Sequence, residues 1–114
     1  MSPITTHVLD TSVGRPAAGI HIVLFRRDDE GSFAEIGRGV TDDDGRLKDL
    51  LPDDHMLLVG VYKIVFQTGA YYAQTGVEGF YPEAVIVFEV RTQAEHYHVP
   101  LLLNPWGYST YRGS

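Results

Sequence analysis

Short stretches of alternating apolar and polar residues, separated by turn-forming residues, are the feature that most limits the possible folds of this chain. Alternation of this kind places successive side chains on opposite faces of a strand. It predicts about eight strands, over residues 4–10, 19–27, 33–41, 47–51, 56–68, 83–92, 96–103 and 108–112. Strands at this spacing are typical of a β-sandwich or barrel, so one all-β domain over residues 1–114 is expected.

Two segments depart from the alternation. Residues 69–75 have the pattern of two helical turns, with Thr68 as the expected N-cap and Gly76 as the expected stop. Residues 42–46, Asp-Asp-Asp-Gly-Arg, predict a tight turn because glycine accepts positive φ. The three aspartates also resemble part of a calcium loop, but Asp53 stands where such a loop needs glutamate. The turn is therefore the favoured interpretation, with Arg46 at its end.

The composition of the chain excludes several classes of function. Its 114 residues suffice for one hydrophobic core, and its net charge of −6 argues against nucleic acid and anionic membranes as partners. There is no cysteine, so neither disulfides nor thiolate chemistry is expected. No apolar run is long enough to span a membrane, and no signal peptide is recognisable. A cytoplasmic protein is the plain expectation.

The last stretch of the chain carries an unusual set of side chains. Residues 104–114 contain Trp106, Tyr108, Tyr111 and Arg112, and end at Ser114. Most chain ends are polar and loose, whereas this one is expected to be packed. If so, Arg112, Ser114 and the free carboxylate expected on Ser114 become candidate parts of a site. The alternative, that the aromatic residues only hold a final strand against the core, stays open.

Histidines offer a second set of candidates. His96 and His98 are two residues apart in a strand-like run and so share one face. Together with His7 they form a possible three-imidazole zinc site like that of a metal hydrolase, although the His-x-His pattern is common and weak. His21 and His55 are interpreted as ordinary exposed or hydrogen-bonded residues.

Four motifs, in the same order, give the chain a family resemblance. They are Thr-Thr-His-Val-Leu-Asp-Thr at 5–11 followed by Gly-Arg-Pro-Ala at 14–17, the segment 41–46, the run 96–103, and Tyr-Ser-Thr-Tyr-Arg-Gly-Ser at 108–114. With these motifs the chain resembles the 5-hydroxyisourate hydrolases, the transthyretin-related enzymes of purine breakdown. The closing Tyr-Arg-Gly-Ser separates these enzymes from transthyretin, the hormone carrier. The resemblance covers nearly the whole chain.

The resemblance implies a transthyretin-like sandwich of eight strands in two sheets with one short helix. It implies a homotetramer, a dimer of dimers, with active sites at the dimer–dimer interface along a central channel. The implied reaction is hydrolysis of 5-hydroxyisourate to 2-oxo-4-hydroxy-4-carboxy-5-ureidoimidazoline, without metal or organic cofactor, which disfavours the zinc alternative. The implied catalytic residues are His7, Arg46 and His98, and Ser114, Tyr111 and Arg112 join His7 and Arg46 in substrate binding.

These residue types suit the chemistry. Attack of water on a ring carbonyl needs a base, a group that stabilises the oxyanion, and an acid for the departing nitrogen. Our hypothesis makes His7 the base and Arg46 the anchor of the substrate. His98 binds the ring or relays a proton, and the Ser114 hydroxyl positions water or substrate.

Two other classes of function compete with the hydrolase. A transthyretin-type carrier would need an apolar channel for its ligand. A protein-contact module would use Trp106 and the tyrosines as interface anchors.

Overall fold

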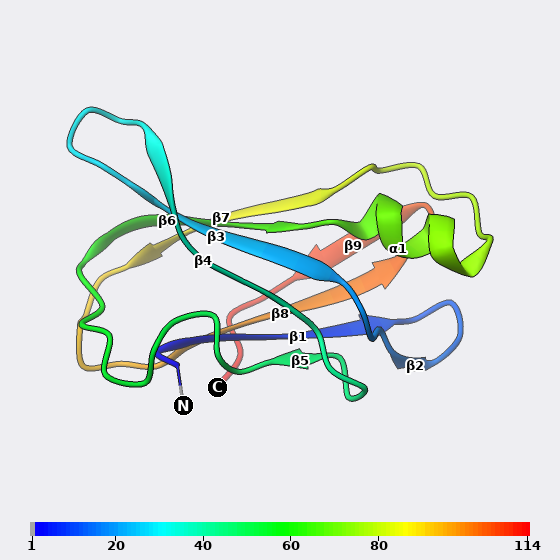
Figure 1. Cartoon of the computed structure of the whole chain (residues 1–114), viewed down its shortest axis with the longest axis horizontal. Helices are drawn as coiled ribbons and strands as arrows, with labels where there is room; N and C mark the ends of the chain where they lie inside the picture. Colours follow the sequence, from blue (N-terminus) through cyan, green and yellow to red (C-terminus); the bar gives the residue numbers. More distant parts are fainter. Residues whose placement is uncertain (1) are drawn as a thin grey trace.

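Two stacked sheets and one helix make up the computed structural model, which describes residues 2–114 (Figure 1). The first sheet has the order β2-β1-β8-β9, with β5 also paired to β1. Its strands are β1 (Ile4–Asp10), β2 (Arg15–Pro16), β5 (Arg46–Leu47), β8 (Tyr97–Asn104) and β9 (Gly107–Thr110). The second sheet has the order β4-β3-β6-β7. Its strands are β3 (His21–Arg27), β4 (Phe33–Val40), β6 (Gly60–Phe66) and β7 (Ala84–Val90). The predicted β-sandwich of two sheets with one short helix is confirmed.

Alternation along each strand builds the core between the sheets. Ile4 and Val8 of β1 and Leu101 of β8 are completely buried, in one cluster with apolar residues of the second sheet. Because successive side chains point to opposite faces, Thr5, His7 and Leu9 must lie on the other face of β1. The first sheet therefore has an outer face that carries polar side chains, and the candidate site is built there.

Strand pairing brings distant parts of the sequence together on this sheet. β1 and β8 run parallel, and their register places Thr5 beside His98. β5 pairs antiparallel with β1, and its register places Arg46 opposite His7. Residues paired in register project to the same face, so positions more than 90 apart in sequence become neighbours.

The structure differs from the expected strands at three places. β2, at residues predicted to form a turn, pairs with the end of β1; two residues are too few to show an alternating pattern. The strands expected over 47–51 and 56–68 shrink to β5 and β6. Leu50, Leu51 and Leu57 are buried all the same, because they pack on the core as loop residues without ladder partners.

The predicted helix is present as α1 (Thr68–Thr75), and it ends at Gly76, whose φ of 73° is left-handed. Its N-cap is Gln67 rather than Thr68. The prediction of Thr68 as N-cap was wrong because the Thr68 hydroxyl donates to the Tyr81 carbonyl at 3.4 Å, away from the helix start. Within residues 2–114 no helix is long and apolar enough to cross a membrane.

Candidate active site

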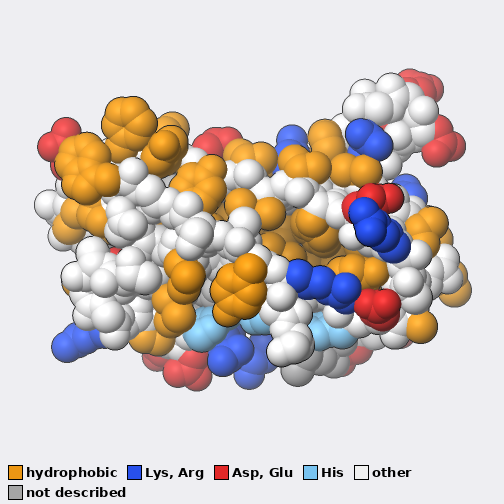
Figure 2. Space-filling view, turned by 180° about the vertical axis from the view of Figure 1, so that it is seen from behind, with side chains coloured by type: hydrophobic (Ala, Val, Ile, Leu, Met, Phe, Trp, Pro, Cys, Tyr) orange, Lys and Arg blue, Asp and Glu red, His pale blue; other side chains and the backbone are white. Residues whose placement is uncertain are grey.

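A small polar cavity lies on the first sheet, where β1, β5, β8 and the tail meet. Its volume is about 310 Å³. Every residue that lines it has a polar or charged side chain: Thr5, Thr6, Arg46, Lys48, His96, His98 and Ser114. In the space-filling view, histidine side chains lie beside Lys and Arg side chains along the lower edge of the molecule (Figure 2). Three of the predicted site residues, Arg46, His98 and Ser114, therefore come together.

A tight turn holds Arg46 in place. The Asp42 carboxylate accepts the backbone N–H groups of Asp44 and Arg46, both at 2.9 Å. Gly45 has a φ of 74°, and a Cβ there would collide with the carbonyl of Val8. The Val8 N–H in turn donates to the Gly45 carbonyl at 2.8 Å. This turn was predicted from Asp-Gly, and it fixes Arg46 to the edge of β1.

His98 is held from its Nδ1 side. Nδ1 lies 2.9 Å from the Thr5 hydroxyl, which leaves Nε2 as the ring nitrogen available to a substrate. Burial lowers the pKa of His98, and the charges of Arg46, His96 and His7 lower it further. The neutral imidazole is consequently the dominant form at neutral pH, as a proton acceptor requires.

His7 lies beside this cavity rather than among the residues that line it. Its Nε2 is 2.9 Å from the carbonyl of Asp44. A carbonyl can only accept, so Nε2 carries the proton and Nδ1 remains as the acceptor. In residues 2–114 no group of three or more His, Cys, Asp or Glu side chains is arranged to hold a metal ion. His96 and His98 instead share Thr5.

Gly113 delivers Ser114 to the cavity. Its N–H donates to the carbonyl of His98 at 2.8 Å, so the tail pairs with β8 beyond the end of β9. A Cβ on Gly113 would lie 2.5 Å from Cδ2 of His98 and 3.3 Å from Cγ of Pro100. Only glycine lets the backbone come this close to the imidazole. The tail is thus tied to β8 through its backbone, whereas Trp106, Tyr108 and Tyr111, which were expected to pack, are exposed.

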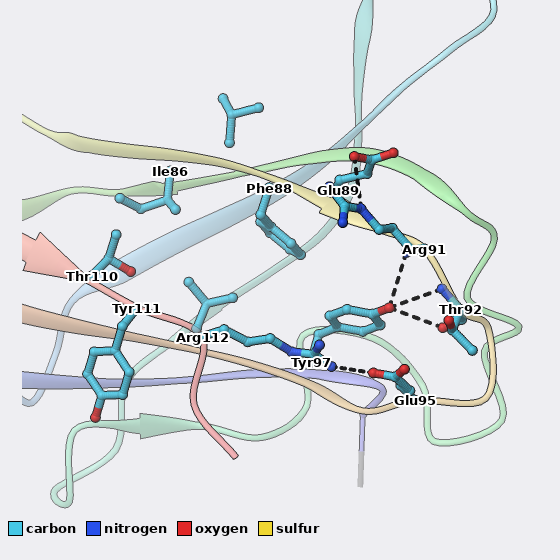
Figure 3. A pocket seen from close by; sticks show the side chains of 12 residues that line it. Ile86, Phe88, Glu89, Arg91, Thr92, Glu95, Tyr97, Thr110, Tyr111 and Arg112 are labelled. Atoms are coloured by element: carbon cyan, nitrogen blue, oxygen red, sulfur yellow. Dashed lines mark hydrogen bonds and ion pairs between the residues drawn. The ribbon is translucent and has the colours of Figure 1, made fainter.

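Tyr111 and Arg112 lie beside a different cavity, although they directly precede Gly113 and Ser114 in the sequence. They line a larger cavity, of about 550 Å³, with walls formed by β7 and β8 (Figure 3). Arg112 donates to Glu95 at 2.6 Å and stands over the Tyr97 ring, 4.4 Å from its centroid. Within one chain, these two predicted substrate-binding residues are thus not brought to the cavity of His98 and Ser114.

Comparison with known proteins places the chain in a family. Residues 4–113 match the model of the HIUase/Transthyretin family. The chain belongs to this family. A Caenorhabditis elegans protein named as a probable 5-hydroxyisourate hydrolase is 49% identical over 111 residues, which are 97% of this chain and 80% of the relative.

Solved structures similar to this chain include both a 5-hydroxyisourate hydrolase and a transthyretin. Klebsiella pneumoniae 5-hydroxyisourate hydrolase has a TM-score of 0.84 and 35% identity, covering 97% of this chain and 98% of its own. Sea bream transthyretin, solved in complex with thyroxine, has a TM-score of 0.92 and 30% identity, covering 98% and 95%. The fold does not separate the two, so the side chains of the site must do so.

Four residues that line the cavity were not predicted as substrate-site residues: Thr5, Thr6, Lys48 and His96. For three of them, Thr5, Lys48 and His96, a predicted site residue lies two positions away, namely His7, Arg46 and His98 in that order. A period of two keeps both members of such a pair on one strand face, so this spacing was the signal that would have found them. From the sequence alone, His96 is a candidate only for a zinc ligand.

Replacing Gly113 by alanine is expected to lower kcat about 10- to 100-fold, because the new methyl group must displace the His98 ring or the tail. The matched control is Gly107→Ala, where a Cβ meets only Asn104 at 4.0 Å. Steady-state kinetics on both variants measure the effect. Equal, wild-type turnover in the two would contradict the role given to Gly113.

Proposed function

We propose that this chain is a 5-hydroxyisourate hydrolase that, as its sequence predicts, acts in the cytoplasm. Its product would be 2-oxo-4-hydroxy-4-carboxy-5-ureidoimidazoline, formed in the breakdown of urate. The observation that carries the proposal is the chemistry of the small cavity, which combines a guanidinium, an ammonium, two imidazoles and the hydroxyls of Thr5 and Ser114. A transthyretin-type carrier of an aromatic ligand needs apolar walls, so this alternative has less support.

The proposed reaction uses side chains alone. Water adds to a ring carbonyl, the adjacent C–N bond breaks, and one proton moves from water to the departing nitrogen. His7 is the proposed base, since its Nε2–H is committed to Asp44 and its Nδ1 can accept. Arg46 anchors the flat, acidic ring and stabilises charge on the oxyanion. His98 presents Nε2 to the ring, and Ser114 positions water or substrate with its hydroxyl.

The role of Tyr111 and Arg112 in substrate binding remains a prediction. The contacts of Arg112 support a role in holding the tail that carries Ser114. The ion pair from Arg112 to Glu95 and its stacking on Tyr97 fix the backbone two residues before Ser114. Both side chains of the pair are about half exposed, so solvent screens their attraction and little effect on stability is expected.

A homotetramer, a dimer of dimers, is the proposed assembly. Among the described residues, β7 and β9 each end their sheet, and both border the larger cavity. Unpaired sheet edges are normally covered by another element or another chain. Exposed Phe80 and Trp106 near these edges are further candidates for contact between subunits. Sedimentation equilibrium tests the assembly, and a species of 12.7 kDa at all concentrations would contradict it.

The test of the activity is direct. Urate oxidase generates 5-hydroxyisourate in the cuvette, and its ultraviolet absorbance is followed with and without this protein. Faster decay with formation of the ring-opened product, unchanged by a metal chelator, is the expected result. Decay at the uncatalysed rate over a range of protein concentrations would refute the proposal.

A further inference from the structure

Thr5 is placed between two imidazoles. Its Oγ1 lies 2.9 Å from Nδ1 of His98 and 3.0 Å from Nε2 of His96. The residue is only 4% exposed, so its hydroxyl depends on these two partners and not on bulk water. The parallel register of β1 with β8 sets this position, because it pairs Thr5 with His98. The register of the sheet therefore fixes this contact.

One hydroxyl between two neutral rings links their tautomers. The Thr5 hydroxyl has a single proton, so it donates to one ring nitrogen and accepts from the other. If His98 carries its proton on Nδ1, Thr5 donates to His96, whose proton must then be on Nδ1 as well. If Thr5 donates to His98, both rings carry the proton on Nε2. The ring to which the Thr5 hydroxyl donates thus determines whether Nε2 of His98 is an acceptor or a donor.

The surroundings favour a positive charge on His96 over one on His98. Both rings line the cavity with Arg46 and Lys48, but His98 is half-buried, and its burial together with the charges of Arg46 and His7 disfavours its imidazolium form. His96 is exposed, so a charge there is stabilised by water. A proton that reaches His98 from the reacting centre is therefore more stable on His96, the ring that is exposed to solvent.

We propose that Thr5 and His96 form a proton relay from His98 to solvent; this inference rests on the proposed function. A proton arrives at Nε2 of His98 as the Nδ1 proton passes to Thr5, while the Thr5 hydroxyl proton passes to Nε2 of His96. His96 then releases its Nδ1 proton to water. Only protons move, and His98 is left with Nε2–H, the form that can protonate the departing nitrogen. The same transfers in reverse restore the starting tautomers.

Kinetics test the relay through the hydroxyl. Thr5→Val keeps the shape but removes the hydroxyl, and it is expected to lower kcat about 10-fold or more while leaving KM within about twofold. Thr5→Ser, which restores the hydroxyl, should recover most of the lost turnover. His96→Phe should cost as much as Thr5→Val, and the double variant no more than either alone. Full kcat in Thr5→Val, or additive losses in the double variant, would overturn the relay.

Two-bond 15N–1H NMR spectra test the relay without substrate. Protonated His96 must donate Nε2–H to Thr5, which then donates to Nδ1 of His98 and leaves that ring in its Nε2–H form. The nitrogen shifts of His98 should therefore follow the titration of His96 in the wild-type protein and become independent of it in Thr5→Val. Independent titration in the wild-type protein would overturn the relay, even if the protein hydrolyses 5-hydroxyisourate. Linked titration in a protein without that activity would refute only the proposed function.

Discussion

Replacing His98 by asparagine is expected to lower kcat for 5-hydroxyisourate about 10²–10⁴-fold, the range for loss of general acid–base help. The asparagine amide can still contact the Thr5 hydroxyl, which lies 2.9 Å from Nδ1 of His98, but it lacks the basic Nε2. The change removes little buried apolar area, so Tm is expected to fall by less than about 5 °C. Stopped-flow decay of the substrate and thermal unfolding measure the two effects.

His21→Asn is the matched control for this prediction. His21 is exposed on β3, in the opposite sheet, so the same substitution there should leave both kcat and Tm near their wild-type values. If His98→Asn turned over as fast as His21→Asn, His98 would have no part in the chemistry. If His98→Asn failed to fold, His98→Gln, which keeps a polar group near Nε2, would carry the test.

Replacing Arg46 by glutamine is expected to lower kcat/KM about 10²–10³-fold, the size of effect seen when a group that stabilises an oxyanion is removed. The kcat/KM of Arg46→Lys should lie between those of the wild type and Arg46→Gln, because lysine keeps the charge but lacks the planar guanidinium that fits two oxygens. The control is Arg38→Gln, in which an exposed cation on β4 loses its ion pair with Glu35. Wild-type kcat/KM in Arg46→Gln would remove Arg46 from the site.

The same substitution makes a prediction about pH. The guanidinium of Arg46 disfavours the imidazolium form of His98 and so helps to lower its pKa. Without Arg46 the pKa of His98 rises, so the neutral imidazole is lost at a higher pH as acid is added. The acidic limb of the kcat/KM profile should then move to higher pH in Arg46→Gln and stay in place in Arg38→Gln. A limb that does not move would show that His98 does not set it.

The fold could largely be predicted from the sequence because burial alternates with a period of two along strands such as β3 and β7. Residues 4–10 were predicted as a strand and form β1 with the same bounds. The approach failed where apolar residues are buried without a ladder. Leu50 and Leu51 pack on the core from a loop, so their hydrophobicity indicated a strand that does not form.

The candidate site was only partly readable. Motifs pointed to Arg46, His98 and Ser114, but alternation could not place Tyr111 and Arg112. The tail leaves β9 after Thr110 and rejoins β8 at Gly113, so the face of each residue between them depends on the path of the backbone. That path is set by hydrogen bonds to distant strands and leaves no local pattern.

A crystal structure with bound urate, a flat analogue of the substrate, tests the central claim most directly. The account predicts that the ring lies in the cavity of about 310 Å³, with two of its carbonyl oxygens about 3 Å from the guanidinium of Arg46 and its edge against His98. A ring bound only in the larger cavity beside Arg112, with no contact to Arg46 or His98, would contradict it.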